Sequence, residues 1–398
     1  MGEIACREPS GSRMTSHSNG DTSGATPLPA GSLAIPSQSP AVAHGACLTI
    51  DLDAIVANWR RLAAEAPGAE CSAVVKADAY GCGLAVVAPA LARAGCGSFF
   101  VAHLEEGIAA RACLPESDIY ILNGLAPGSA PAFAEHRLIP VLGSHEELAE
   151  WAALSEGQWP AALHVDTGMN RLGLRVPEAL ALAGDPLLAR AGIRLLMSHL
   201  VSAEKPDEPV NARQIEAFAA LRQALPGIPA SLANSSGVFL GAAARHDLLR
   251  PGYALYGGNP TPYRTENPMR PVVRLDSPIL QIRDVEAGDT AGYNARWQAP
   301  SPRRLATLSI GYADGYPRSA SNAGRALVEG VACPILGLIS MDLIILDVTN
   351  VPGARRGTMA TLIGDGLDID AVGQAAGTIG YEILTGLGSR YVRSYTGG

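Results

Sequence analysis

The sequence is poor in charged and aromatic residues and has no excess of basic side chains. Of its 398 residues, 17% are charged and 5% aromatic, whereas 47% are hydrophobic, a balance typical of globular proteins. Asp and Glu outnumber Lys and Arg by 38 to 30, which argues against a nucleic-acid surface because phosphate binding needs clustered cations. No apolar stretch approaches the roughly 18–20 residues that cross a bilayer. We therefore expect a globular protein that binds neither nucleic acid nor membrane.

Cysteine and histidine patterns that mark disulfide frameworks or metal sites are also lacking. The seven cysteines are odd in number and never spaced as Cys-x-x-Cys, and the eight histidines form no His-x-x-x-His pair. This pattern favours free thiols in a reducing cytoplasm, and it predicts no metal site.

The first 40 residues differ from the rest of the chain. Ser, Gly, Pro, Thr and Ala dominate them, and no apolar region follows a basic start, so a secretory signal is not indicated. We expect a disordered leader over residues 1–46, because such a composition cannot bury enough surface to fold. Met14 is a second candidate start.

From residue 47 onward, short apolar runs alternate with Ala- and Leu-rich helical stretches. Strands that are apolar on both faces and linked by helices indicate a parallel sheet. About eight such units within residues 47–275 predict an α/β fold, a TIM-like (β/α)8 barrel. The runs cover residues 48–52, 72–77, 98–102, 118–123, 139–143, 162–167, 193–200 and 230–235.

Helical periodicity is lost after about residue 275. Short runs separated by Gly and Asp predict a C-terminal, mostly antiparallel β domain over residues 276–396, with a short helix near 369–376. The expected strands cover residues 272–285, 304–310, 326–331, 334–338, 343–348 and 358–363.

Side chains with reactive or anion-binding groups stand at the ends of several barrel runs. Lys76 ends one run; alone it is best read as a lysine reaching solvent, yet a lysine with a lowered pKa there can form an imine. Arg171 in a Gly-flanked loop can clamp a carboxylate, and Ser235 precedes a helix start that suits phosphate. His199 alone is typical of a buried core residue. Since barrel active sites lie at the carboxyl ends of strands, Lys76, Arg171, Arg250 and the Ser235 loop together predict a pyridoxal phosphate site.

Seven motifs in order make the chain resemble alanine racemases from about residue 48 to residue 395. They are AVVKADAYG at 73–81, VDTGMNRLG at 165–173, Asn234-Ser235, RPG at 250–252, GYADG at 311–315, SMD at 340–342 and TIGYE at 378–382. The resemblance implies a pyridoxal phosphate barrel with a C-terminal β domain. It also implies a homodimer with shared active sites that interconverts L- and D-alanine, for peptidoglycan or for D-alanine catabolism.

The resemblance implies a role for each candidate residue. Lys76 is expected to hold the cofactor as an internal aldimine and to take the Cα proton of the D substrate. Tyr293, supplied by the partner chain, is the expected base for the L substrate. Arg171 and the backbone of Met341 are expected at the substrate carboxylate. The expected cofactor contacts are His199 and Arg250 at the ring, and Tyr80, Ser235, Gly252, Tyr253 and Tyr381 at the phosphate; Tyr312 and Tyr381 would form a narrow entryway.

The arginine at position 250 favours racemisation over other pyridoxal phosphate chemistry. Arg does not give up its proton, so the pyridine nitrogen that it faces in this family stays unprotonated and transamination is suppressed. A decarboxylase, which wants a protonated ring, is therefore disfavoured. A non-catalytic cofactor-binding protein would not need Tyr293 and Arg171 together.

Three positions depart from the family pattern. His164 stands where many members have a lysine, carbamylated in some, so the group that orients Arg171 is open. Asp78 replaces a commoner Asn and Cys82 a commoner His, both close to Lys76. Substrate breadth is also open, because serine or another small amino acid could pass a slightly wider entryway.

Overall fold

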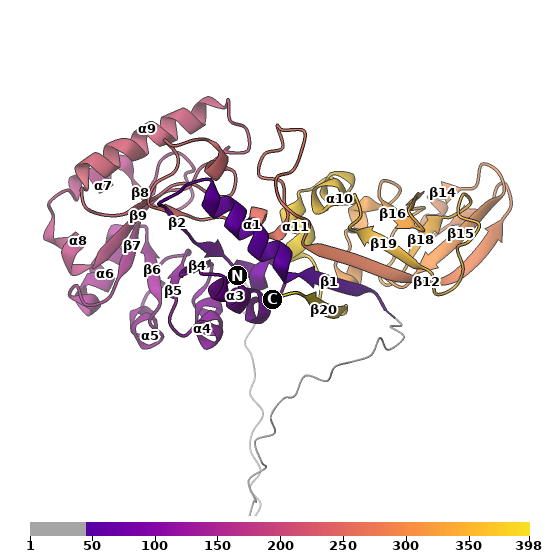
Figure 1. Ribbon diagram of the computed structural model, residues 1–398, viewed down its shortest axis with the longest axis horizontal. Coiled ribbons are helices and arrows are strands. Elements are labelled where there is room, and N and C mark those ends of the chain that lie inside the picture. Colours follow the sequence, from indigo (N-terminus) through magenta and orange to yellow (C-terminus); the bar gives the residue numbers. More distant parts are fainter. Residues whose placement is uncertain (1–44) are drawn as a thin grey trace, which may run out of the picture. The chain divides into compact units, whose positions relative to one another are not determined.

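The computed structural model describes residues 45–398 (Figure 1). The predicted leader, except for Gly45 and Ala46, and the candidate start Met14 lie outside the described residues. No helix within residues 45–398 is long and apolar enough to span a bilayer. The six cysteines of this range form no disulfide.

The parallel strands of the barrel follow one another along the chain, with β2 and β3 forming one strand interrupted at Ser72. They are β2 (Glu70–Cys71), β3 (Ala73–Val74), β4 (Ser98–Val101), β5 (Asp118–Ile121), β6 (Ile139–Leu142), β7 (Ala161–Asp166), β9 (Ile193–Met197), β10 (Ala230–Ser231) and β11 (Leu248–Leu249). Each pairs with the next from β3 to β10, and a short strand β8 (Leu174–Arg175) pairs with β7.

Hydrogen bonds between the last and the first strands close this barrel. Strand β11 pairs in parallel with β2. The N–H of Ser72 donates to Leu249 O at 3.0 Å, and the N–H of Val74 donates to Pro251 O at 2.9 Å. On the other side of β11, the N–H of Arg250 donates to Ala233 O at 2.9 Å. The predicted (β/α)8 barrel is therefore confirmed.

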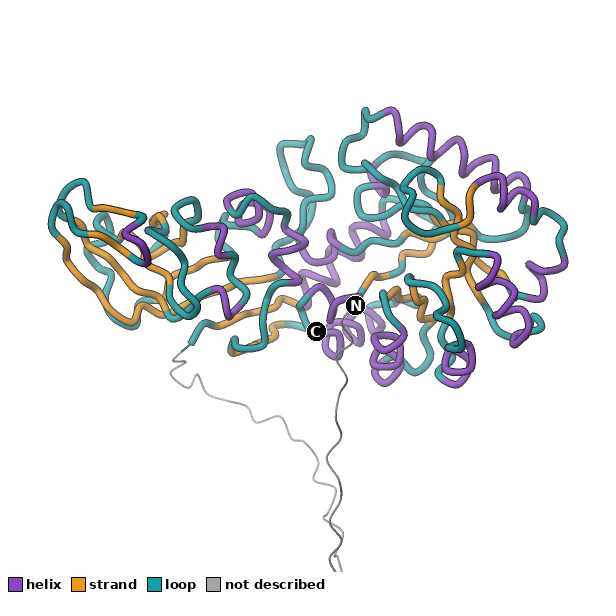
Figure 2. The backbone as a smooth tube through the Cα atoms, turned by 180° about the vertical axis from the view of Figure 1, so that it is seen from behind, coloured by secondary structure: helices purple, strands orange, loops and turns teal. Residues whose placement is uncertain are grey.

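Helices between the strands cover the outside of the barrel (Figure 2). They are α1 (Leu52–Ala64), α3 (Leu84–Arg93), α4 (Leu104–Cys113), α5 (Ala130–Glu135), α6 (His145–Ser155), α7 (Val176–Ala181), α8 (Pro186–Arg190) and α9 (Pro209–Ala224). The short elements α2 (Lys76–Tyr80), which is a left-handed turn, and the 3-10 turns η1 (Gly237–Phe239) and η2 (Tyr253–Tyr256) follow strand ends. Local sequence sets several starts: Asp51 and Ser144 accept N–H groups of α1 and α6 as N-caps.

The first predicted run, residues 48–52, is not a barrel strand. It forms β1 (Cys47–Asp51), which pairs antiparallel with β12 (Val273–Val285) and parallel with β20 (Val392–Thr396) in the C-terminal sheet. Its burial alternates, with Leu48 and Ile50 inside, which is typical of a strand with only one face in a core. The barrel strand that the sequence prediction missed is β11. It is only two residues long, so it produces no recognisable sequence periodicity.

The C-terminal domain is a mostly antiparallel sheet in the order β17-β16-β19-β12-β1-β20, with β15 pairing β12 and β18. Its other elements are β13 (Thr290–Ala291), η3 (Tyr293–Ala295), β14 (Trp297–Gln298), β15 (Arg303–Leu308), η4 (Tyr312–Asp314), η5 (Arg318–Ala320), β16 (Arg325–Val328), β17 (Val331–Pro334), β18 (Ile344–Asp347), β19 (Met359–Ile363), α10 (Ile369–Ala375) and α11 (Gly380–Thr385). The predicted β domain and its helix α10 are confirmed. The strand expected at 334–338 lies earlier, as β17, because Glu329 and Gly330, both with positive φ, make a two-residue hairpin turn.

Glycine 315 allows a close backbone contact inside the C-terminal domain, next to η4. Its φ is +99°, and a Cβ added there would collide with the carbonyl oxygen of Gly386. Gly330 has a φ of +79° but open space around the same position.

We expect Gly315→Ala to lower the free energy of unfolding by about 2 kcal/mol more than Gly330→Ala. Both variants place an alanine in a left-handed backbone conformation, which is destabilising, whereas only Gly315→Ala also adds steric overlap with a carbonyl oxygen. Urea titration of the two variants measures the difference, and equal losses would contradict the contact.

Candidate functional site

A cavity of about 400 Å³ lies at the carboxyl ends of the barrel strands. Nine residues that the sequence singled out line it together, although they come from six separate stretches of the chain. They are Lys76, Tyr80, Arg171, His199, Ser235, Arg250, Gly252, Tyr253 and Tyr381. The barrel is the reason for this convergence, since parallel strands bring their carboxyl ends to one pole.

Lys76 follows the end of β3 and is partly buried in the cavity wall. Burial lowers its pKa, the positive charge of Arg171 lowers it further, and the carboxylate of Glu106 opposes both effects. A lysine with a lowered pKa is a better nucleophile and base near neutral pH than an exposed one.

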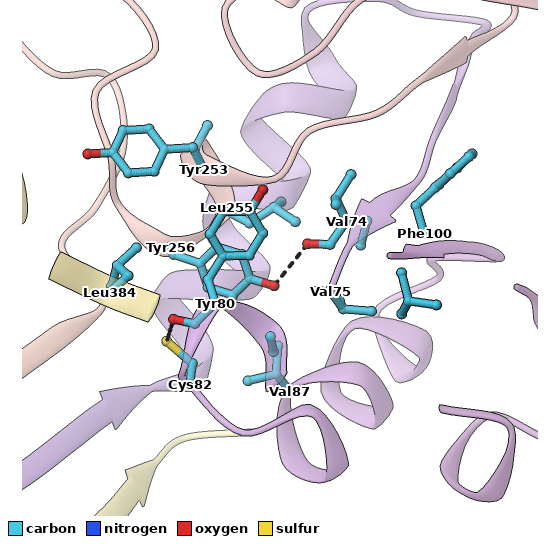
Figure 3. Packing of buried hydrophobic residues seen from close by; sticks show 14 of the residues in the cluster. Val74, Val75, Tyr80, Cys82, Val87, Phe100, Tyr253, Leu255, Tyr256 and Leu384 are labelled. Atoms are coloured by element: carbon cyan, nitrogen blue, oxygen red, sulfur yellow. Dashed lines mark hydrogen bonds between the residues drawn. The ribbon is translucent and has the colours of Figure 1, made fainter. Parts of the chain in front are cut away.

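Tyr80 reaches the same cavity from the turn that follows Lys76. Its ring stacks on Tyr256 with centroids 4.7 Å apart, and the Tyr256 hydroxyl donates to Val74 O at 3.1 Å (Figure 3). The Tyr80 hydroxyl lies against Gly252, where a Cβ would come within 2.5 Å of it. The glycine at position 252 therefore leaves room for this hydroxyl beside the backbone.

Ser235 and the backbone after Arg250 form a small polar cradle. The Ser235 Oγ accepts the N–H of Gly252 at 3.0 Å and of Ala254 at 3.2 Å. These amides open η2, and the Ser235 side chain is 4% exposed. Amide and hydroxyl donors gathered at the start of a helical turn are suited to a phosphate.

Arg250 is a buried cation that lines the same cavity as this cradle. Its side chain is 4% exposed; it donates to the Ser231 hydroxyl and, at 2.5 Å, to Ser198 O. Burial lowers its pKa to about 10, so the guanidinium keeps its charge at neutral pH.

The two histidines of the cavity, His164 and His199, are neutral because they are buried near Arg250. Burial, with the charge of Arg250, lowers the pKa of His199 to about 3 and that of His164 to about 4. A neutral imidazole can accept a hydrogen bond as well as donate one. His164 is the departure from the family pattern, and it lies in the wall that Arg171 also lines.

The loop that carries Arg171 is held by one carboxylate. Asp166 accepts the N–H of Gly168 at 2.7 Å, of Met169 at 2.8 Å and of Arg171 at 3.2 Å. Burial alone would raise the pKa of Asp166, but these hydrogen bonds outweigh it and the pKa is lowered. The backbone of Arg171 is thus fixed, while its side chain stays exposed to the cavity.

Tyr381 enters the cavity from the C-terminal domain, on α11. Its ring stacks on Tyr253 at 3.8 Å between centroids, with 9° between the planes. The Tyr253 hydroxyl donates to Asp370 Oδ1 at 2.6 Å. A side chain at position 380 would collide with that hydroxyl, so Gly380 leaves room for this arrangement. Sequence reasoning missed Asp370, because a lone acid in a short helix carries no signal of its partner.

Three predicted site residues do not line this cavity. Tyr293, Tyr312 and Met341 are 67%, 41% and 53% exposed. The loops of the last two are joined by hydrogen bonds from the N–H of Tyr312 to Ser340 O and of Ala313 to Met341 O. All three lie on the C-terminal domain, and within residues 45–398 none of them faces the cavity of its own chain.

The fold and the cavity define the class first: a (β/α)8-barrel enzyme followed by a β domain that adds residues to the barrel's active-site pole. Two family models match the chain, the alanine racemase N-terminal domain over residues 50–260 and the alanine racemase C-terminal domain over residues 272–395. The chain belongs to the alanine racemase family.

Individual relatives are similar over almost their whole length. An alanine racemase of Methylobacterium nodulans is 66% identical, over 89% of this chain and 97% of that one. A catabolic alanine racemase of Mesorhizobium japonicum is 50% identical, over 89% and 94%. The crystal structure of alanine racemase from Bartonella henselae with covalently bound pyridoxal phosphate is 42% identical, covers 88% of this chain and 99% of that one, and has a TM-score of 0.85.

The neutral state of His164 predicts a measurable loss of stability in acid. Its pKa of about 4 in the folded protein lies below the usual 6.5, so the unfolded chain binds the proton first. The stability is therefore fully present above pH 6.5 and is lost as pH falls toward 4. We expect the free energy of unfolding of His164→Gln to decrease between pH 7 and pH 4 by about 3 kcal/mol less than that of the wild type.

Denaturant titrations between pH 7 and 4 test this, with His145→Gln as control, since His145 is exposed at the start of α6. If His164→Gln followed the wild-type pH dependence, the neutral state of the buried imidazole would be disproved.

Proposed function

We propose that this chain is a pyridoxal phosphate-dependent racemase that interconverts L- and D-alanine. The observation that carries the proposal is the meeting of Lys76, Arg250 and the Ser235 cradle in one cavity, in a chain of the alanine racemase family. One relative is named a catabolic alanine racemase and another is named without that qualifier. The same reaction serves supply and removal of D-alanine.

The residues of the cavity fit the proposed cofactor. The space that Gly252 leaves beside the Tyr80 hydroxyl, with the Ser235 Oγ and the amides of Gly252 and Tyr253, suits a phosphate group. We assign Tyr381 to the same end. Lys76 would supply the covalent attachment, and His199 and Arg250 would lie at the ring.

Arg250 would set the character of the reaction. When bound, pyridoxal phosphate stabilises the electron pair left at the substrate Cα. A guanidinium that stays charged, held by Ser231 and Ser198, gives no proton to a ring nitrogen. That limits how far charge spreads from Cα, and it favours return of a proton there over transfer elsewhere.

Two bases on opposite faces of Cα would move the proton. We assign Lys76 to the D substrate and Tyr293 to the L substrate, with Arg171 and the Met341 backbone at the substrate carboxylate. Because Tyr293 is exposed outside the cavity of its own chain, we propose that it acts in a partner's site, in a homodimer. Tyr312 would come from the partner with it and, with Tyr381, would narrow the way in, so that a methyl side chain passes best.

Lys76→Ala is expected to abolish conversion in both directions, because this amine would hold the cofactor and move the proton. The chain has only two lysines, Lys76 and the exposed Lys205, so Lys205→Ala is a matched control that should keep wild-type rates. An amino-acid panel resolved by chiral chromatography gives rates and substrate breadth together. Undiminished racemisation by Lys76→Ala would refute the proposal.

Mixing two inactive variants tests the shared site. Lys76→Ala and Tyr293→Phe homodimers should each be almost inactive. A Lys76→Ala subunit can lend its Tyr293 to the intact Lys76 of a Tyr293→Phe subunit. Refolding the two together should therefore restore about a quarter of the wild-type rate, because half of the dimers are mixed and each has one complete site. No recovery, with mixed dimers demonstrated by native mass spectrometry, would show that each site is built from one chain.

A further inference from the structure

The backbone after Lys76 makes an unusual left-handed turn. Ala77, Asp78, Ala79 and Tyr80 all have positive φ values, of 53° or 54°. An L-residue pays roughly 1–2 kcal/mol for this conformation, so such a turn persists only where its surroundings hold it. The turn joins Lys76 to Tyr80, and both side chains line the cavity.

The C-terminal domain holds the far end of this turn. Arg393 Nη1 donates to Gly81 O at 2.6 Å, and the Tyr395 hydroxyl donates to Cys82 O at 3.1 Å. A Cβ at Gly81 would overlap the carbonyl oxygen of Leu384 on α11. The end that carries Tyr80 is therefore packed against β20 and α11.

A single carboxylate holds the near end. Glu106, in the first turn of α4, accepts the N–H of Ala77 at 2.7 Å through Oε1. Its Oε2 accepts the N–H of Ala102 at 2.7 Å and of His103 at 3.2 Å. Glu106 thus ties the residue next to Lys76 to the backbone that follows β4, and both of its oxygens are used.

We propose that Glu106 is the positioning residue for Lys76: its carboxylate clamps the first amide of the left-handed turn and so fixes where the lysine amine lies in the cavity. The proposal rests on the proposed function, because it gives Lys76 the covalent and base roles. Glu106 also acts on Lys76 through its charge. Arg171 and His199 face the same amine from other elements, and Glu106 is the acid that favours its charged form against Arg171.

The test compares Glu106→Gln with Glu105→Gln in the holoenzyme. Glu105 is the exposed neighbour on α4, and its side chain makes no hydrogen bond or ion pair within residues 45–398. We expect Glu106→Gln to lower kcat from D-alanine about tenfold, with KM changed less than about twofold, because the amine is misplaced rather than the substrate. The acidic limb of the kcat profile should move down by about half a pH unit, since a nearby negative charge is lost.

Two further measurements separate positioning from folding. Hydroxylamine should release pyridoxal phosphate from Glu106→Gln several times faster than from Glu105→Gln, which is a readout independent of turnover. Adding Ala77→Gly, which removes the cost of positive φ at that residue, should restore part of kcat without restoring the pH limb. If Glu106→Gln alone folds poorly, the recovery of kcat in the double variant with Ala77→Gly still tests the proposal.

The proposal would be overturned if Glu106→Gln matched Glu105→Gln in kcat, pH limb and cofactor release. The proposal would also be overturned if Glu106→Gln lost kcat, Ala77→Gly restored none of it, and the acidic limb of the kcat profile did not move. Glu106 would then be a purely structural residue. Absence of racemisation by the wild type would instead contradict the proposed function. The rate of cofactor release by hydroxylamine would still show whether Glu106 positions Lys76.

Discussion

The hydrogen bonds that close the barrel between β2–β3 and β11 are the constraint on which the site depends. The groups that they join, Ser72 with Leu249 and Val74 with Pro251, lie far apart in the sequence. By pairing them, the fold brings Lys76, two residues after Val74, and Gly252, directly after Pro251, into the wall of one cavity. The lysine and the phosphate-type cradle thus share this cavity because the first and last strands are neighbours. A one-residue slip of this register would turn one of them away from the cavity.

The site is built almost wholly from positive and neutral groups. Arg250 keeps its proton despite burial, and its charge helps to keep the nearby imidazoles of His199 and His164 neutral. Arg171 and Lys76 add further positive charge, opposed at the lysine by Glu106. Such a cavity attracts anions, which suits a phosphate and a substrate carboxylate together.

Much of this could be predicted from the sequence, and the exceptions have physical causes. Eight of the nine cavity residues stand in motifs that follow barrel strands, and the ninth, Tyr381, stands in the motif on α11. Local patterns therefore sufficed to identify all nine. The run at 48–52 joins the C-terminal sheet and not the barrel, and the sequence does not show this because a short apolar strand does not reveal its partners. The roles of Glu106 and Asp370 could not be predicted from the sequence. Each accepts a hydrogen bond from a residue far away in the chain, Glu106 from the Ala77 N–H and Asp370 from the Tyr253 hydroxyl, and no sequence periodicity indicates such a contact. The roles given to Tyr293, Tyr312 and Met341 stay predictions that need a second chain.

The most direct test of the central claim is to locate the covalent attachment of the cofactor. Borohydride reduction of the purified holoenzyme, followed by proteolysis and mass spectrometry, fixes a pyridoxyl group on whichever amine held it. With only Lys76 and Lys205 as lysines, the measurement has few possible answers. We predict one pyridoxyl group per chain, on the peptide that contains Lys76. A label on Lys205, or none on either lysine, would contradict the account.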